Sequence, residues 1–318
     1  MPAFAVAVVS PSSEAGVKGY DRPLYLLPFD HRASFQRELL GFASGPTEDQ
    51  AQTIRDYKQV IFEGFLLALD AGVPKQDSGI LVDEEFGAAI ARRARSEGIT
   101  LAMPAEKSGQ EEFELQYGDD FAAHIVEFDP TFCKVLVRYN PEADVGLNRR
   151  QATRLAKLSV WLAGEPYRFM FELLVPATEA QMGQVGGDRA AYDDSLRPRL
   201  MLRAIAELQA AGVDPDVWKV EGLDRQEDCA AVVGQARQGD RDGVGIIVLG
   251  RGETEAHVER WLEVAAQVPG YIGFAVGRTA WWDPLVDLRD GKTSRDQSAR
   301  DIATAFRRLV DHWVEHAG

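Results

Sequence analysis

The residues from 168 to 220 decide the fold that the sequence predicts. They begin with the apolar run RFMFELL (168–174), continue through an amphipathic segment at Leu196–Ala211, and end with a second apolar run, VWKV (217–220). A buried strand, a helix and another buried strand in this order form the βαβ unit of a parallel sheet. This part of the chain therefore predicts an α/β fold.

The same alternation extends in both directions along the chain. Eight short apolar runs occur, at Leu24–Phe29, Gly79–Val82, Thr100–Met103, Cys133–Val137, Arg168–Leu174, Val217–Val220, Gly245–Leu249 and Ile272–Val276. Eight strand and helix pairs close a (β/α)8 TIM barrel, whereas an open doubly wound sheet usually has fewer strands. We expect the barrel and keep the open sheet as the alternative.

Amphipathic segments between these runs are the predicted helices. They are Thr47–Ala71, Phe86–Glu97, Arg149–Ala163, Leu196–Ala211 and Thr254–Val268, with Ser294–His316 after the last run. No long Pro-, Gly- or Ser-rich linker divides the chain, so residues 1–318 are predicted to form one domain. Within it, residues 1–20 are an N-terminal extension and 294–318 a closing C-terminal helix. The segment Gly183–Asp194 is interpreted as a polar loop.

Composition narrows the classes of function. The chain has 50 acidic and 35 basic residues, a net charge of −15 and two cysteines, Cys133 and Cys229. This charge disfavours nucleic acid and anionic membranes as partners, and so few thiols fit the cytoplasm. The apolar stretch Ala3–Val9 is too short to span a bilayer and is expected to form a strand or a plug at the barrel bottom. No nucleotide-binding P-loop is present.

Several charged residues fall inside the apolar runs. Alternation along a strand turns Trp218 and Val220 toward the helices and places Lys219 in the barrel lumen. By the same reasoning Glu172, Lys134 and Arg138 point inward. Asp30 ends the first run, and Arg278 follows the last. A structural ion pair would explain any one of them, but barrel active sites are built at these carboxyl ends, so we expect a catalytic cluster.

A lumen lysine suggests imine chemistry. Burial beside another cation is expected to lower the pKa of Lys219 or Lys134, which would free the amine to attack a ketone. Glu172 could then move protons, and Asp30 could hold or deprotonate a hydroxyl group. These residue types suit an aldolase that forms a Schiff base.

The ends of the last two runs suggest an anion site. They read Gly250-Arg251-Gly252 and Gly277-Arg278-Thr279, where glycines admit backbone N–H groups and arginine adds a bidentate donor. We interpret Gly250, Arg251, Gly277 and Arg278 as phosphate-binding, and a glycine corner with a solvated arginine is the alternative.

Metal chemistry has little support in the sequence. Of the five histidines only His31 lies near the end of a predicted strand, and the helical spacing of His312 and His316 fits a contact with the helix dipole. We predict neither a metal nor another cofactor.

The sequence resembles the class I tagatose-1,6-bisphosphate aldolase family along nearly the whole barrel. The landmarks are Phe29-Asp30-His31-Arg32, Ile80–Gly87, Ala105-Glu106-Lys107-Ser108-Gly109, Lys134-Val135-Leu136, Phe171-Glu172, Lys219-Val220-Glu221 and Gly277–Trp281. The resemblance implies that Lys219 is the Schiff-base lysine, Glu172 the proton shuttle and Lys134 the second lysine. It also implies that Asp30 is the first-strand aspartate and that Gly277 and Arg278 bind phosphate.

His31 stands where that family has glutamine, which leaves the identity of the sugar open. The whole chain resembles more closely the barrel module fused to 5-dehydro-2-deoxygluconokinase in bacterial inositol catabolism. That resemblance implies cleavage of 2-deoxy-5-keto-D-gluconate 6-phosphate into dihydroxyacetone phosphate and malonate semialdehyde.

Alternatives to this lyase activity are tagatose-1,6-bisphosphate cleavage and a barrel that binds phosphosugars without catalysis. His31, Arg32, Lys107 and Arg138 are further candidate substrate-binding residues. The residue that holds a second anionic group stays open among Arg32, Lys107, Arg138 and Arg251. We also expect a functional link to a sugar kinase and leave a homo-oligomer open.

Overall fold

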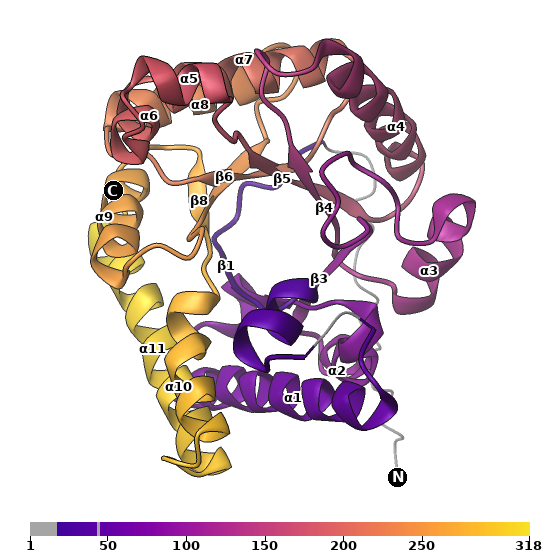
Figure 1. Ribbon diagram of the computed structural model, residues 1–318, viewed down its shortest axis with the longest axis vertical. Helices are drawn as coiled ribbons and strands as arrows, with labels where there is room; N and C mark the ends of the chain where they lie inside the picture. The colour runs from indigo at the N-terminus through magenta and orange to yellow at the C-terminus, as the bar shows by residue number, and fades with distance from the viewer. Residues whose placement is uncertain (1–17, 43–44) are drawn as a thin grey trace, which may run out of the picture.

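The computed structural model describes residues 18–42 and 45–318, and it contains one closed barrel of eight parallel strands. Figure 1 shows the strands as an inner ring with the helices outside them. The strands are β1 (Leu24–Pro28), β2 (Ser78–Leu81), β3 (Thr100–Pro104), β4 (Phe132–Arg138), β5 (Arg168–Leu174), β6 (Val217–Glu221), β7 (Gly245–Leu249) and β8 (Tyr271–Ala275). The predicted (β/α)8 TIM barrel is confirmed, and the open sheet is excluded.

The predicted helices are present with ends shifted by a few residues. They are α1 (Glu48–Asp70), α2 (Glu84–Ser96), α4 (Val145–Ala163), α7 (Arg197–Ala210), α9 (Glu255–Ala266) and α11 (Arg295–His316). The chain's last helix, α11, packs against α1 and α10, and so joins the end of the described chain to its beginning (Figure 1). The expected plug at Ala3–Val9 and most of the expected extension 1–20 lie outside the described residues.

The structure also contains helices that the sequence analysis did not predict. These are α3 (Phe121–Phe128), α5 (Glu179–Gln184), α6 (Arg189–Ser195), α8 (Gln226–Ala236) and α10 (Arg278–Arg289), together with a π-helical turn, η1 (Phe35–Leu39), and the short 3₁₀ turns η2 (Lys75–Asp77) and η3 (Gly118–Asp120). The interpretation of Gly183–Asp194 as a polar loop was wrong for its second half, because the Asp188 side chain caps α6 there, whereas the first half holds only the end of α5 and a turn.

Side chains alternate between two apolar layers, as the strand pattern predicts. The lumen is filled by a separate cluster that includes Leu26, Phe132, Met170, Val217 and Ile247. Their neighbours on the same strands, such as Phe169, Phe171 and Trp218, belong to the cluster between strands and helices. Lys134, Glu172 and Lys219 alternate in step with the lumen residues, so their side chains enter the upper part of the barrel.

The strand register brings two of these positions, Glu172 and Lys219, to one level. Leu136 of β4 lies opposite Glu172 of β5, and Glu172 lies opposite Lys219 of β6. Because side chains repeat every two residues, Lys134 lies one inward layer below this level and Arg138 one layer above it. From the inside of the barrel toward the carboxyl ends of the strands, the charged side chains therefore lie in three layers: Lys134, then Glu172 and Lys219, then Arg138.

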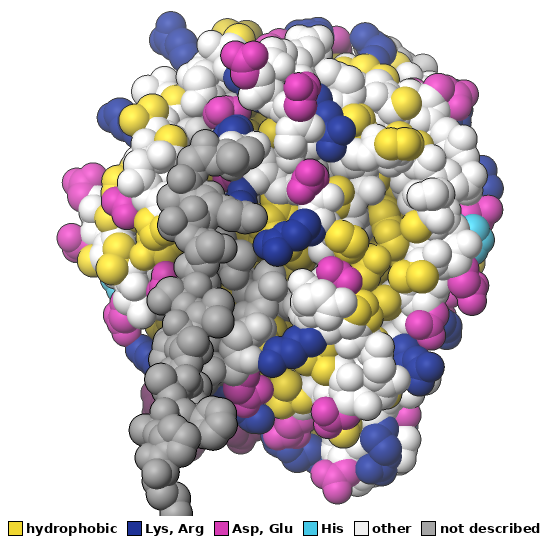
Figure 2. Space-filling view, turned by 180° about the vertical axis from the view of Figure 1, so that it is seen from behind, with side chains coloured by type: hydrophobic (Ala, Val, Ile, Leu, Met, Phe, Trp, Pro, Cys, Tyr) yellow, Lys and Arg dark blue, Asp and Glu magenta, His cyan; other side chains and the backbone are white. Residues whose placement is uncertain are grey.

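The face of the molecule behind the view of Figure 1 exposes apolar side chains near its middle. Figure 2 shows apolar side chains toward the middle of its described surface, with a few basic side chains among them and most charged groups around the edge. No helix in the described part of the chain is both long and apolar enough to cross a membrane.

A buried ion pair supports the first strand from behind. Lys58 of α1 and Asp83, which follows β2, are almost fully buried and form a hydrogen-bonded ion pair. Lys58 Nζ also donates to the Phe29 carbonyl at 2.8 Å, and Asp83 accepts from the Phe86 backbone N–H at 2.9 Å, which caps α2. This pair therefore fixes the backbone that leads into Asp30.

We expect Lys58→Met to lower the free energy of unfolding by about 3 to 5 kcal/mol, because it leaves the Asp83 carboxylate buried without its partner. Urea unfolding measures the change. The double variant Lys58→Met/Asp83→Asn should recover part of it, and Lys157→Met, the same change at an exposed position of α4, should have little effect. A Lys58 variant as stable as the Lys157 control would contradict this account.

Candidate active site

A cavity of about 340 Å³ opens at the carboxyl ends of the strands. Its floor carries charged side chains from five strand ends, namely Asp30, Glu106, Lys134, Glu172 and Lys219. These five side chains are at most about a tenth exposed. The predicted catalytic residues Asp30, Lys134, Glu172 and Lys219 thus lie together in one cavity.

Lys134 is the centre of this cluster. Its Nζ lies 2.9 Å from Asp30 Oδ2, 2.9 Å from Glu106 Oε1 and 2.8 Å from Glu172 Oε2. Burial alone would lower the pKa of the ammonium, but the three carboxylates outweigh burial and raise the pKa well above its usual range. The expectation of a lowered pKa is therefore wrong for Lys134, because the predicted second cation is outnumbered by acids at this atom.

Glu172 connects the two lysines. Its Oε2 contacts Lys134, and its Oε1 lies 2.9 Å from Lys219 Nζ, whose side chain is 4% exposed. Burial would raise the pKa of Glu172, but the ammonium groups of Lys134 and Lys219 reverse the effect and lower it. Lys219 has only this carboxylate as an ion-pair partner among the described residues, so its amine is the less restrained of the two.

Asp30 and His31 form the wall at the end of β1. The pKa of Asp30 is lowered because Lys134, His31 and Lys219 together outweigh its burial. The pKa of His31 is lowered to about 4, chiefly because burial disfavours the charged ring, and Lys219 adds to this effect. Its Nδ1 is buried without a hydrogen-bond partner in the described structure, and the ring packs edge-on against Trp281. His31 is therefore a neutral imidazole at pH 7.

Glu106 belongs to the site although the sequence analysis assigned it no role. It is not a strand residue, because it lies two positions after Pro104, the last residue of β3. One carboxyl oxygen accepts from Lys134, and the other is buried with no partner in the described structure. Burial raises its pKa despite Lys134 and Arg32. Its place three residues after the predicted strand Thr100–Met103 was the signal available in the sequence.

The predicted binding residues at the cavity mouth fall into two groups. Arg32 is 7% exposed and donates to the Glu106 carbonyl at 2.8 Å, so it supports the wall of the cavity. Lys107 and Arg138 line the mouth, together with Arg37. Lys107 is about half exposed and 3.7 Å from Glu114, and Arg138 is exposed and donates to the Gln110 carbonyl at 3.0 Å.

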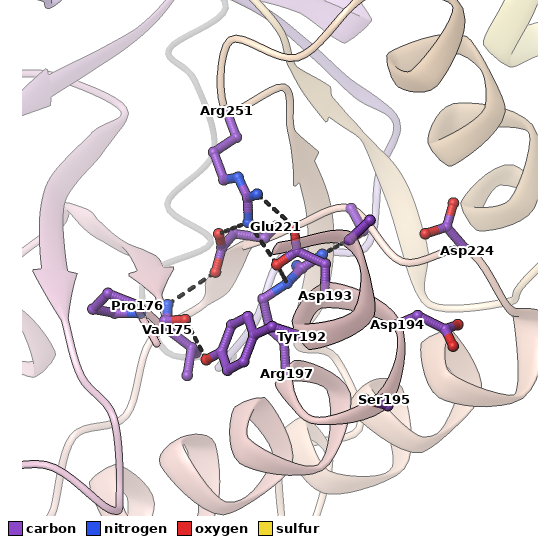
Figure 3. A network of polar contacts seen from close by, with 12 residues as sticks. Val175, Pro176, Tyr192, Asp193, Asp194, Ser195, Arg197, Glu221, Asp224 and Arg251 are labelled. Carbon is purple, nitrogen blue, oxygen red and sulfur yellow. Dashed lines mark hydrogen bonds and ion pairs between the residues drawn. The ribbon is translucent and has the colours of Figure 1, made fainter. Parts of the chain in front are cut away.

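Arg251 lies apart from the residues that line the cavity. Figure 3 shows it reaching from the loop after β7 to Glu221 and Asp193, with Arg197 on the other side of Asp193. Its Nη1 is 2.7 Å from Glu221, and its Nη2 is 2.6 Å from Asp193 and 3.3 Å from Glu253. Neighbouring Gly250 is packed against Val276. Three carboxylates thus surround the guanidinium, which ties α6 to the ends of β6 and β7. A phosphate-binding role for Gly250 and Arg251 stays a prediction.

Arg278 stands behind the cavity rim. Its Nη2 is 3.1 Å from Glu38, a residue of η1 that lines the cavity, and its guanidinium lies over the Trp282 ring. Gly277 precedes α10, and a Cβ there would lie 2.0 Å from the Pro28 carbonyl, so only glycine fits. No side chain caps this helix N-terminus. Phosphate binding by Gly277 and Arg278 stays a prediction that would require Glu38 to give way.

Histidines elsewhere have structural partners. His312 contacts the Glu259 carbonyl, and His316 contacts the His312 carbonyl. Within residues 18–42 and 45–318, no group of three or more His, Cys, Asp or Glu side chains is arranged to hold a metal ion. At the floor of the cavity, the point where three carboxylates meet is taken by the Lys134 ammonium.

Comparison with known proteins gives a family. The family model described as "Uncharacterized protein conserved in bacteria (DUF2090)" matches residues 16–317. The chain belongs to this family. Among solved structures, the DUF2090 chain is similar to that of Cgl0159 from Corynebacterium glutamicum, with a TM-score of 0.59 and 18% identity, over 93% of this chain and 88% of that one. At this identity the likeness concerns the fold alone. No curated protein matches the DUF2090 chain.

The state of His31 predicts a pH dependence of stability. Its pKa in the folded protein, about 4, lies below the ordinary value of 6.5, so the unfolded chain takes up the proton first as the pH falls. The stability contributed by the neutral ring is present above pH 6.5 and is lost between pH 6.5 and 4. Urea unfolding at pH 7, 6 and 5 should show a smaller loss for His31→Gln than for the wild type. Equal losses in the two proteins would contradict the lowered pKa of His31.

Proposed function

We propose that this protein is a class I aldolase, a carbon–carbon lyase that cleaves a phosphorylated ketose through a Schiff base on Lys219. The observation that carries the proposal is the position of Lys219 Nζ, which is buried at the cavity floor 2.9 Å from Glu172. The same glutamate is held by Lys134 at 2.8 Å. A nucleophile beside a fixed proton acceptor is the arrangement that covalent catalysis needs.

Formation of the imine uses Glu172 twice. Glu172 first takes a proton from the Lys219 ammonium, and the free amine attacks the ketone carbon to give a carbinolamine. Glu172 then returns the proton to the carbinolamine hydroxyl, water leaves, and a protonated imine remains on Lys219. Lys134 keeps its charge throughout, because three carboxylates hold its pKa high, so it steadies Glu172 and does not compete as a nucleophile.

Cleavage of the carbon–carbon bond follows from the imine. Glu172, ionised again, accepts the proton of the hydroxyl group two carbons from the imine carbon, and the bond between the hydroxyl-bearing carbon and its neighbour breaks. Its electron pair moves into the imine to give an enamine, and the aldehyde is released. Glu172 protonates the enamine carbon, and water hydrolyses the resulting imine. Asp30, ionised beside Lys134, orients the reacting hydroxyl.

The substrate that we propose is 2-deoxy-5-keto-D-gluconate 6-phosphate, cleaved to dihydroxyacetone phosphate and malonate semialdehyde. The sequence resemblance supports this choice, and with it we propose a role in carbohydrate metabolism, in the inositol catabolism of the cytoplasm. The uncapped N-terminus of α10, with Gly277 and Arg278, offers backbone N–H groups for the phosphate. His31, in the place of a glutamine, would contact the sugar hydroxyls.

Covalent trapping tests the proposal. Borohydride with dihydroxyacetone phosphate should add one reduced adduct to the wild type, at Lys219, as peptide mass spectrometry would show. Lys219→Met should remove the adduct and the activity. An adduct on Lys134, or turnover by Lys219→Met, would refute the assignment, and a wild type that binds the ketone without forming an adduct would indicate a barrel that does not catalyse. A product assay over ketose phosphates, including tagatose 1,6-bisphosphate, identifies the substrate.

The role of Glu172 gives a second prediction. Glu172→Gln should lower kcat by about a hundredfold to ten-thousandfold and change KM only a few-fold, because proton transfer is lost while the binding groups remain. Steady-state kinetics, expressed per folded molecule from a melting curve, measures this. Normal turnover in a destabilised variant would instead assign Glu172 a purely structural ion-pairing role.

A further inference from the structure

Arg138 occupies the outermost inward position of β4, directly above the candidate active site. Its side chain is exposed and lines the cavity mouth. Among the described residues it has no carboxylate within ion-pair distance, and its guanidinium donates one hydrogen bond, at 3.0 Å, to the backbone carbonyl of Gln110. Arg32 and Arg251, by contrast, are held by acids. Arg138 therefore keeps most of its donors available for a ligand.

The height of Arg138 above Lys219 matches the length of a short carbon chain. Leu136, Glu172 and Lys219 share one register level, and Arg138 lies two residues beyond Leu136, which is about 6.6 Å along the strand. The four carbon–carbon bonds between the ketone and the carboxylate of the proposed substrate span about 5 Å, at about 1.5 Å a bond. The two lengths are comparable once the arginine side chain is allowed to bend.

The order of strands places Arg138 on the opposite side of the barrel from Arg278, which stands behind the cavity rim. In the closed ring β4 is four strands from β8, and β6, which carries Lys219, is two strands from each. A ketone bound to Lys219 would therefore have its phosphate side toward the end of β8 and its aldehyde-forming side toward the end of β4. This arrangement suits a substrate with one anionic group on each side of the carbonyl.

The charges of the mouth favour a carboxylate over a second phosphate at this end. Arg37, Lys107 and Arg138 line it, but so do Glu38, Glu111 and Glu114. The three acids offset the three bases, so the rim has no net positive charge that would favour a dianion, and a guanidinium without an acid partner is enough to hold a monoanion. The planar guanidinium also matches a carboxylate with two parallel hydrogen bonds.

Gln151 of α4 holds Arg138 in place. This fully buried side chain donates from Nε2 to the Arg138 carbonyl at 3.1 Å, and its Oε1 accepts from the Phe113 backbone N–H at 2.8 Å. The end of β4 and the loop between β3 and α3 are thus fixed to each other through one amide. Arg138 thus stands on a fixed backbone, while its guanidinium has only the hydrogen bond to Gln110 among the described residues.

We propose that Arg138 binds a carboxylate on the aldehyde half of the substrate and so selects a keto-acid phosphate over a ketose bisphosphate. This inference rests on the proposed aldolase function. It makes Arg138 a specificity-determining residue, whereas Lys219 and Glu172 carry out the chemistry common to both substrates.

The test runs the reaction in the direction of synthesis, from dihydroxyacetone phosphate and three aldehydes of different charge. Malonate semialdehyde carries a carboxylate, glyceraldehyde 3-phosphate a phosphate, and propanal no charge. Arg138→Met should lower kcat/KM for malonate semialdehyde by about tenfold to a hundredfold, the range for loss of one charge-assisted hydrogen bond, and change propanal less than threefold. Arg149→Met, an exposed arginine of α4, should change neither.

Two outcomes overturn the inference. Equal losses for malonate semialdehyde and propanal would show that Arg138 supports the fold or the chemistry, and a loss confined to glyceraldehyde 3-phosphate would make it a phosphate site. Binding of 3-hydroxypropionate, a carboxylate that cannot react, is measured by calorimetry and does not depend on catalysis. We expect 3-hydroxypropionate to bind Arg138→Met about tenfold more weakly than the wild type. Equal binding refutes the inference about Arg138, even if the wild type forms no imine. If the wild type forms no imine but the binding difference is seen, only the aldolase proposal is refuted.

Discussion

The buried ammonium of Lys134 is the interaction on which the site depends. Asp30, Glu106 and Glu172, from the ends of β1, β3 and β5, each approach it within 3 Å. Burying a charge costs free energy unless partners surround it. The ion pairs with Lys134 therefore hold the ends of β1, β3 and β5 close to β4, in addition to the hydrogen bonds of the sheet. The Lys134 cluster thus helps to set the shape of the cavity floor.

The same cluster separates the two lysines chemically. Lys134 forms ion pairs with three carboxylates and stays charged. Lys219 has one carboxylate partner among the described residues and faces the cavity. Two amines of one residue type thereby gain different roles from their surroundings alone, a division of labour known from paired acids in enzymes. Glu106 extends it to the carboxylates, because burial raises its pKa while the pKa values of Asp30 and Glu172 are lowered.

Sequence patterns predicted the barrel and the inward direction of Lys134, Glu172 and Lys219, because period-two alternation in a buried strand leaves charged residues no other place. They failed where contacts between distant parts of the chain determine a pKa or the position of a side chain. The pKa of Lys134 depends on acids from three other elements, and the isolation of Arg251 from the cavity depends on Asp193 in a helix that looked like a loop. Helices such as α3 and α10 were missed because the first is short and the second contains Pro284.

The double hydrogen bond of Gln151 has a consequence for motion. One amide group holds both Phe113 in the loop after β3 and the backbone of Arg138, and Arg138 in turn holds Gln110 of that loop. Any displacement of the loop away from the barrel must loosen the support beneath Arg138. A ligand that bridges Arg138 and the floor would therefore keep the loop down, and product departure and loop release would be thermodynamically linked.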